Sequence, residues 1–450
     1  MTKTRATKTT LPQPVFREPI FNEKTKTVDP GGFLTPHPSD KDLYNSIQDL
    51  LTKDVVKFDK SRAADGDLLE LSDIYGPHGP ELMKQIDAAG KIIFHALGDS
   101  GPSNAGKYKN ELRVADQLTM DCSNANQANH PAFLFHLGDV VYDFGESQYY
   151  FDQFYDPFRN YPLPIFAIPG NHDSFITPKT PPPEEPLKTF SRNFCASRLT
   201  ITPEARSLHR TAMTQPGVYF SLDAPFVRII GLFSNALEDP GVISSEAGKW
   251  PIVPDFQLSF LSAQLKRIKD EGYKGAVLLA VHHPPFSYAP PPTASARRGD
   301  HGSSPNMLRQ IDTICKQEGV YPHAFISGHA HNYQRYTRTI RFLGRELDVP
   351  FVVCGDGGHN VNRVVSGSKG HPAEEPNDGV EVDYLESSPA VDVAGLLLEK
   401  YDDTNYGYLR ISVDSEQLRI GFHQVGNSSL AQSRFDLVTV DLESHTMVAN

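Results

Sequence analysis

The chain has 450 residues, of which 39% are hydrophobic and 22% charged, and these fractions are typical of a water-soluble globular protein. Its length allows one large α/β domain or roughly two to three smaller domains. The formal net charge of -12 argues against a general nucleic-acid binder, because affinity for a phosphate backbone comes from clustered lysine and arginine.

Segments for export or membrane insertion are not evident in the sequence. The first residues, MTKTRATKTTLPQPVFREPIF, contain no apolar run that could form the core of a signal peptide. No window approaches the roughly 18 to 20 apolar residues of a membrane span. The cysteines are far apart, which argues against a disulfide scaffold; they are Cys122, Cys195, Cys315 and Cys354. We therefore expect a cytoplasmic protein without membrane contact, with an extracellular location as the alternative.

Three regions follow one another along the chain. Residues 1–88 are rich in proline, glycine, aspartate and lysine, and they predict a partly irregular N-terminal arm with one helix over 39–55. Residues 89–430 are expected to form the main domain, which carries the chemistry. Residues 431–450 are expected to form a C-terminal tail.

Apolar runs alternate with amphipathic stretches from Lys91 onward. The runs KIIFHAL, AFLFHL, PIFAIP, FVRIIGLF, GAVLLAVH and HAFIS predict strands buried on both faces. Helices are predicted for NELRVADQLTMDC, FQLSFLSAQLKRIKDEG and NMLRQIDTICKQEG, and this alternation indicates a layered α/β fold. The later segment YGYLRISVDSEQLRIGFHQV predicts two strands with a turn at Asp414 and Ser415. Proline-rich stretches at 177–186 and 284–304 predict long surface loops.

Side chains of the metal-binding type follow five of the predicted strands. The segments are GDSG at 98–101, GDVVY at 138–142, GNHD at 170–173, HHPP at 282–285 and GHAH at 328–331. In an open α/β sheet, ligands bind beyond the carboxyl ends of the strands. One Gly-Asp pair after a strand is often a turn with a capping aspartate, but five such segments in succession are not explained by capping. We therefore expect them to form one site.

The number of donors indicates two metal ions. The segments supply seven ligands, namely Asp99, Asp139, Tyr142, Asn171, one of His282 and His283, His329 and His331. Seven are too many for one tetrahedral ion, and they suit two ions that also bind water. Two ions that share a carboxylate are the arrangement used for phosphate-ester displacement. Residues i and i+2 of an extended segment share one side, so His329 and His331 can each face a metal.

In this order, GDSG, GDVVY, GNHD, LAVH and GHAH resemble the motifs of the calcineurin-like metallophosphoesterases and, more closely, of the purple acid phosphatases. The resemblance covers about residues 90 to 335, and VPFVVCGDGGHN and YGYLRISV are similar to the closing strands of that family. The subfamily is indicated by Ser100 and Gly101 where the wider superfamily has D-x-H, and by Tyr142. The resemblance implies a layered α-β-β-α sandwich of two mixed sheets flanked by helices.

The same resemblance implies how the ligands divide between the ions. Asp99, Tyr142 and His331 would hold Fe(III), Asp139 would bridge, and Asn171, His282 and His329 would hold Fe(II), Zn or Mn. A trivalent cation favours phenolate and carboxylate oxygen, whereas imidazole suits Zn or Fe(II). His282 is favoured over His283 because it stands two residues before a proline, as in the family. Purple acid phosphatases usually carry a signal peptide, and none is evident in this sequence. A Zn, Mn or mixed centre is therefore the alternative to the ferric assignment.

We therefore expect a dinuclear-metal phosphoester hydrolase that acts on a small phosphorylated substrate, with a metal-bound hydroxide as the nucleophile. The first hypothesis is a phosphomonoesterase of acid-phosphatase type. The alternatives are a phosphodiesterase or nucleotide pyrophosphatase on the same scaffold and, third, a non-catalytic binding scaffold. No nucleic-acid partner is expected, and the sequence leaves the oligomeric state open.

Histidines beside the ligands are the candidates for proton transfer. His172 is predicted to donate a proton to the leaving alcohol or a hydrogen bond to phosphate, and His283 is the second candidate, because the ordinary pKa of imidazole is close to neutral pH. Asp173 is predicted to orient a neighbouring group. Substrate guidance is a further hypothesis for three residues of the second proline-rich stretch, Arg297, Arg298 and His301.

Overall fold

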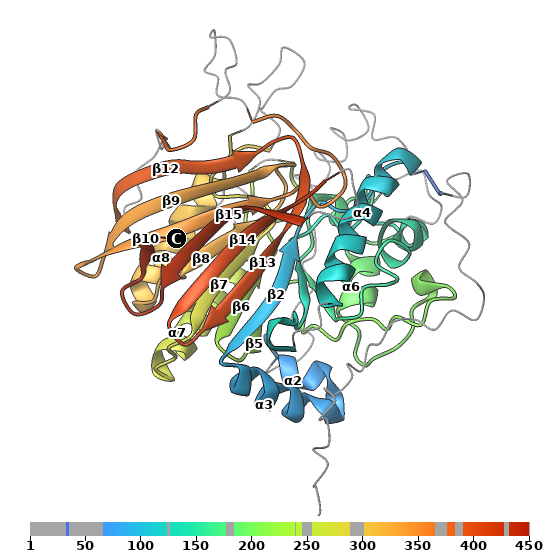
Figure 1. The fold of residues 1–450 in the computed structure, drawn as a ribbon, viewed down its shortest axis with the longest axis horizontal. Coiled ribbons are helices and arrows are strands. Elements are labelled where there is room, and N and C mark those ends of the chain that lie inside the picture. Colours follow the sequence, from blue (N-terminus) through green and yellow to red (C-terminus); the bar gives the residue numbers. More distant parts are fainter. Residues whose placement is uncertain are drawn as a thin grey trace, which may run out of the picture.

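The computed structural model describes residues 33–35, 66–123, 127–176, 184–238, 240–244, 254–288, 301–364, 376–382, 390–426 and 432–449. Within these residues the chain forms two β-sheets, which pack against each other (Figure 1). The helix predicted over 39–55 lies outside the described residues, as do Arg297 and Arg298.

The first sheet contains nine strands in the described residues, in the order β1-β5-β6-β7-β8-β10-β9-β12-β11. Its strands β6, β7, β8 and β10 are parallel, whereas β9, β12 and β11 add antiparallel pairs. The bounds are β1 (Leu68–Glu70), β5 (Phe220–Ala224), β6 (Val227–Leu232), β7 (Ala276–Val281), β8 (Ala324–Ser327), β9 (Tyr333–Phe342), β10 (Arg345–Cys354), β11 (Val380–Glu381) and β12 (Asp392–Asp402).

The second sheet contains seven described strands in the order β16-β15-β14-β13-β2-β3-β4. Strands β2, β3 and β4 are parallel, and β13 continues the sheet antiparallel to β2, with Ile411 opposite Phe94. The bounds are β2 (Lys91–Leu97), β3 (Leu134–His136), β4 (Ile165–Ala167), β13 (Tyr406–Asp414), β14 (Gln417–Val425), β15 (Gln432–Asp441) and β16 (Thr446–Val448).

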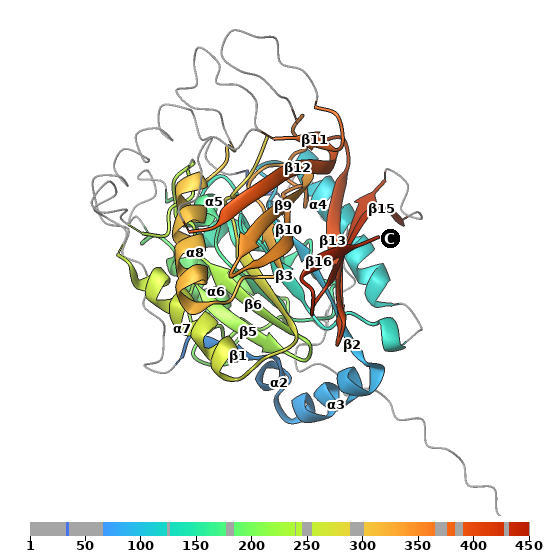
Figure 2. The same ribbon diagram turned by 90° about the vertical axis from the view of Figure 1, so that its left-hand side faces the viewer.

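Helices cover the outer faces of both sheets. Figure 2 shows α7 (Phe256–Asp270) and α8 (Pro305–Glu318) on one side of the sandwich and α4 (Ala105–Cys122) on the other. Helix α7 contacts β6 of the first sheet, and α4 contacts β13 and β14 of the second. The shorter helices are α2 (Leu71–Ile74), α3 (Gly79–Ala89), α5 (Asn171–Ser174) and α6 (Lys188–Phe194). The fold is therefore the expected α-β-β-α sandwich.

The predicted strands and helices are confirmed where the structure describes them. KIIFHAL forms β2, and the central runs GAVLLAVH and HAFIS contain β7 and β8, whose residues are all buried. These strands have two apolar faces because each lies between the two sheets' shared core and a covering helix or loop. The turn predicted at Asp414 and Ser415 joins β13 to β14.

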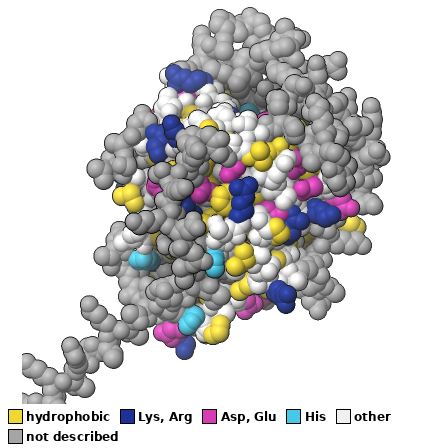
Figure 3. Space-filling view, turned by 90° about the vertical axis from the view of Figure 1, so that its right-hand side faces the viewer, with side chains coloured by type: hydrophobic (Ala, Val, Ile, Leu, Met, Phe, Trp, Pro, Cys, Tyr) yellow, Lys and Arg dark blue, Asp and Glu magenta, His cyan; other side chains and the backbone are white. Residues whose placement is uncertain are grey.

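The predicted division into arm, main domain and tail stays a prediction. Residues assigned to the arm form β1, which pairs in parallel with β5, and residues assigned to the tail form β15 and β16, with β15 paired to β14. On the face in Figure 3, the described basic side chains are intermixed with acidic ones. Among the described helices, none combines the length and the apolar character that a membrane crossing requires.

Candidate metal centre

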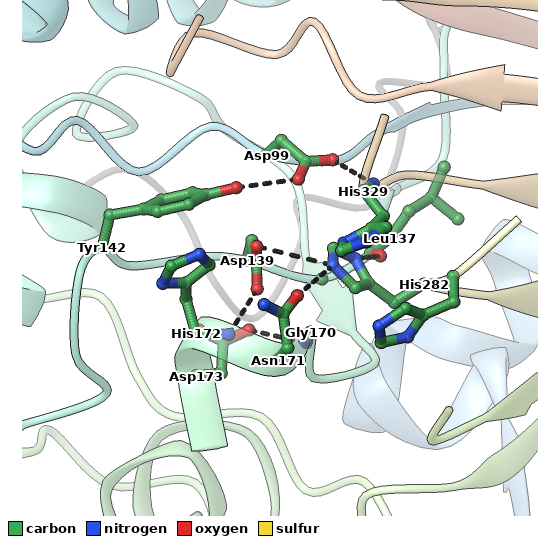
Figure 4. A network of polar contacts seen from close by, with 12 residues as sticks. Asp99, Leu137, Asp139, Tyr142, Gly170, Asn171, His172, Asp173, His282 and His329 are labelled. Atoms are coloured by element: carbon green, nitrogen blue, oxygen red, sulfur yellow. Dashed lines mark hydrogen bonds and ion pairs between the residues drawn. The ribbon is translucent and has the colours of Figure 1, made fainter. Parts of the chain in front are cut away.

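Five loops bring the predicted ligands together at the carboxyl ends of the parallel strands. Asp99 follows β2, Asp139 follows β3, and Asn171 begins α5 just after β4. On the other sheet, His282 follows β7, and the GHAH segment at 328–331 follows β8. Figure 4 shows side chains from both sheets directed towards one another. The site therefore lies where the ends of the two sheets meet, as the strand-end pattern predicts.

One half of the site gathers Tyr142, Asp99 and His331. The Tyr142 hydroxyl donates a hydrogen bond to Asp99 Oδ1 at 2.8 Å and lies 3.0 Å from His331 Nε2. His331 Nε2 is 3.4 Å from the same Asp99 oxygen. The second Asp99 oxygen accepts the backbone N–H of His329 at 2.7 Å. Two oxygens and one nitrogen thus converge on one point, as in a metal-ligand set.

The other half gathers Asp139, Asn171 and His282. His282 Nε2 lies 3.0 Å from Asn171 Oδ1 and 3.4 Å from Asp139 Oδ2. His282 Nδ1 donates to the carbonyl of Leu137 at 2.8 Å, which leaves Nε2 as the nitrogen that carries a lone pair in the neutral ring. Ligand atoms of Asp99, Asp139 and His282 all lie within 4.8 Å of one another. The carboxylates of the two halves, Asp99 and Asp139, therefore lie close enough to serve neighbouring ions.

The backbone is strained at these ligands. Asp99, Asp139 and His329 have φ angles of 58°, 56° and 69°, in the left-handed region that side chains with a Cβ seldom adopt. Such strain persists only where the surroundings enforce it, and it concentrates at functional sites. Gly170 shows how close the packing is, because a Cβ there would lie 2.1 Å from Asp139 Oδ1. The glycine of GNHD is needed for this approach.

The electrostatics of the buried cluster favour positive charge. Burial opposes ionisation of Asp139, but the charges of the neighbouring histidines and the hydrogen bonds from His282 and Tyr142 together outweigh it and lower the pKa of this carboxyl. Burial likewise acts to lower the pKa of His282, yet Asp139 raises that pKa to about 9. Burial raises the pKa of Asp99 to about 7. Carboxylates crowded out of water are stabilised by cations, so this oxygen and nitrogen donor set fits two metal ions.

The other two predicted histidine ligands, His329 and His331, are kept neutral by burial. Burial lowers the pKa of His331 to about 3 and that of His329 well below its ordinary value. A metal ligand must be the neutral ring, so burial prepares both for binding. The His329 ring lies 5.0 Å from His282, between centroids. The structure therefore brings all seven predicted ligands into one cluster.

His172 lies against Tyr142, with ring centroids 4.2 Å apart. Its backbone N–H donates to Asp139 Oδ1 at 2.9 Å, and its Nδ1 donates to the carbonyl of Asp143 at 2.9 Å. Asp173, the next residue, accepts N–H bonds from Gly170 at 2.9 Å and from two residues of the GDVVY segment, Val140 and Val141. Asp173 thereby joins the GDVVY and GNHD loops, in agreement with the predicted orienting role.

His283 is held differently from His172. It is fully buried, and its two ring nitrogens lie 2.8 Å from Ser234 Oγ and 2.7 Å from the carbonyl of Leu237. Burial lowers its pKa to about 3. This geometry favours a positioning role for His283 over the predicted proton transfer.

Three further residues adjoin the cluster. His301, which belongs to the second proline-rich stretch, lies 4.7 Å from both His329 and His331, between ring centroids. Glu238 accepts a hydrogen bond from Asn171, and nothing in the sequence around it indicates this contact. His359 stacks on Tyr142 with 3.6 Å between ring centroids, a contact that the resemblance of its segment CGDGGHN to a closing strand does not indicate.

Comparison with known proteins identifies the family of the chain. The family model of the calcineurin-like phosphoesterases matches residues 69–333, and the chain belongs to this family of metal-dependent phosphoester hydrolases, which use a dinuclear metal centre. No curated protein matches the chain. Among solved structures, "Structure of PhoD" is similar with a TM-score of 0.45 and 12% identity, over 80% of this chain and 71% of that one.

Proposed function

We propose that the chain is a dinuclear-metal phosphomonoesterase of the purple acid phosphatase type, acting on a small phosphorylated substrate. The observation that carries the proposal is the position of the Tyr142 hydroxyl, 2.8 Å from Asp99 and 3.0 Å from His331. A phenol oxygen among these donors suits a hard trivalent cation. A nonpolar aromatic side chain would serve equally well if the position required only packing.

In this proposal the ligands divide between two ions. Asp99, Tyr142 and His331 hold Fe(III), Asn171, His282 and His329 hold Fe(II), Zn or Mn, and Asp139 contacts both; a Zn/Mn pair is the alternative. When bound, the ions neutralise phosphoryl oxygens and lower the pKa of water. Burial of the ligands keeps bulk water out of the site, which strengthens each electrostatic interaction there.

His172 is the proposed proton donor to the leaving alcohol. Because its Nδ1 donates to the Asp143 carbonyl, the proton that can be exchanged is the one on Nε2. The contact with the Tyr142 ring and the hydrogen bond from the His172 backbone N–H to Asp139 fix the position of this imidazole. Donation to a poor leaving group in the transition state is what a general acid of this kind contributes.

Metal analysis and substrate comparison test the proposal. Purified protein is analysed for iron, zinc and manganese, and its hydrolysis of p-nitrophenyl phosphate is compared with that of bis-p-nitrophenyl phosphate. A higher kcat/KM for the monoester, with iron and a divalent metal present, supports it. A preference for the diester would favour the phosphodiesterase alternative, and an absence of hydrolysis with both metals bound would favour a binding scaffold.

A further inference from the structure

Glu238, in the loop that follows β6, contacts a predicted metal ligand directly. The Asn171 side-chain nitrogen donates to Glu238 Oε2 at 3.1 Å. A carboxylate only accepts hydrogen bonds, so this contact requires that the amide nitrogen of Asn171 faces Glu238. The amide oxygen then faces the opposite way, towards His282 Nε2 at 3.0 Å. Since the oxygen is the atom that binds a cation, Glu238 selects the orientation in which Asn171 acts as a ligand.

The loop that carries Glu238 is fixed by His283. Ser234 Oγ accepts the backbone N–H of His283 at 3.0 Å and lies 2.8 Å from its Nδ1. At the other end of the loop, the carbonyl of Leu237 lies 2.7 Å from His283 Nε2. A Cβ on Gly241 would lie 2.5 Å from the Cβ of His283, which shows how closely the following segment packs. His283 therefore sets the position of residues 234–237 and so of the next residue, Glu238.

The second oxygen of Glu238 faces another part of the site. Glu238 Oε1 lies 3.7 Å from His301 Nε2, and the two side chains are 22% and 16% exposed. The His301 ring in turn lies 4.7 Å from the rings of His329 and His331. One carboxylate thus connects the amide of Asn171 with an imidazole above the GHAH pair. Because Glu238 and His301 are both partly exposed, they lie at the edge of the site, and we expect substitution of Glu238 to leave the hydrophobic core intact.

We propose that Glu238 is a positioning residue of the metal centre, which orients the Asn171 amide for metal binding, and that His283 acts through it by anchoring its loop. This inference rests on the proposed function only in taking Asn171 as a ligand. Outer partners of metal ligands contribute to metal affinity because they hold the donor atom in its binding orientation. Replacing them costs about 10- to 100-fold in metal affinity or activity.

Divalent-metal affinity of the full chain tests the inference, with Zn²⁺ as the probe in competition with a chelator. Glu238→Ala is expected to weaken binding of the more weakly held ion by about 10- to 100-fold. Glu238→Gln is expected to lose less, because its carbonyl oxygen can still accept from Asn171. Glu346→Ala, at an exposed position of β10, is the matched control and should bind as the wild type does. Thermal unfolding verifies that each variant is folded.

A double-substitution cycle separates positioning from a general structural effect. In an Asn171→Ala background, Glu238→Ala should cause no further loss of Zn²⁺ affinity, because the amide it orients is gone. His283→Gln should weaken Zn²⁺ binding in the wild type and much less in Glu238→Ala. Unchanged Zn²⁺ affinity in Glu238→Ala, fully additive losses in the cycle, or a wild-type chain that binds fewer than two ions would overturn the inference.

Phosphatase rates keep this inference distinct from the proposed function. Both kcat and KM are measured for the same variants at saturating Zn²⁺. Under this condition, activity that was lost only through weaker metal binding is restored. If the wild type binds two ions and Glu238→Ala binds the second weakly, the inference holds even when the chain hydrolyses no phosphomonoester, which is the failure of the proposed function alone.

Discussion

The Tyr142 hydroxyl donates a 2.8 Å hydrogen bond to Asp99, although both side chains are buried and belong to loops of different strands. Burial and the charges of Asp139 and Asp99 raise the pKa of Tyr142 well above its ordinary value. A phenolate at this position therefore requires a strongly charged cation close to the oxygen. The ring is fixed for that contact between His359 on one face and His172 on the other.

Tyr142→Phe tests the ferric assignment. A phenolate bound to Fe(III) absorbs visible light, so the oxidised wild-type protein should be coloured and the variant colourless. Phenylalanine keeps the ring between the two imidazoles, so we expect thermal unfolding to change little while Fe(III) affinity falls. An unchanged visible spectrum in Tyr142→Phe, or a colourless wild type that contains iron, would remove Tyr142 from the ligand set and favour the Zn/Mn centre.

His172→Ala tests the general acid. We expect turnover of a phenyl or alkyl phosphate to fall by on the order of 10² to 10⁴. The loss should shrink for p-nitrophenyl phosphate, because a good leaving group needs no proton. Rates across a series of leaving groups give this dependence directly. An equal loss for every leaving group would indicate that His172 binds phosphate or positions Asp139 instead.

Acid should destabilise the fold in part through His323. Its Nδ1 accepts the backbone N–H of Val277 at 3.0 Å, and burial lowers its pKa to about 4. The folded pKa is below the ordinary value of 6.5, so the unfolded chain binds a proton on this histidine before the folded chain does. The stabilising effect of neutral His323 is therefore complete above about pH 6.5 and is lost as the pH falls towards 4. His323→Gln should weaken the pH dependence of the free energy of unfolding over this interval. His78→Gln, at an exposed position, should leave that dependence unchanged.

Breaking the buried ion pair of α8 and β9 should be costly. Arg338 donates to both oxygens of Asp312 at 2.9 Å, and both side chains are fully buried. Asp312→Ala would leave the guanidinium buried without its counter-ion, which costs about 3 to 5 kcal/mol. Urea unfolding measures the change. Asp392→Ala, which breaks an exposed pair with Arg341, is the control and should have little effect. Equal effects of the two substitutions would contradict the prediction.

Much of the fold was predictable because the buried strands have simple patterns. A run such as AVLLAV can be buried on both faces only between packed layers, and this is the environment of β7. The order of the strands was not predictable from these patterns. The place of β1 beside β5, for example, depends on pairing between residues more than 150 positions apart, such as Leu69 with Leu222.

The candidate site was predictable where a predicted ligand closely follows a strand, as Asp99 and Asp139 do. Residues that act on the ligands from elsewhere carried no local signal. Glu238 stands in the sequence NALEDPG, and its contact with Asn171 exists because His283 anchors a loop from another strand. Such contacts depend on the tertiary arrangement of loops, which the spacing of residues does not encode.

Asp139 provides the most direct test of the central claim, a phosphoester hydrolase with two metal ions that share one carboxylate. The measurement is metal content per chain and the rate of p-nitrophenyl phosphate hydrolysis, for the wild type and Asp139→Ala, with circular dichroism to establish folding. We predict two ions per chain and hydrolysis in the wild type, and a folded variant that has lost hydrolysis and at least one ion. Hydrolysis near the wild-type rate by metal-depleted Asp139→Ala would contradict the account.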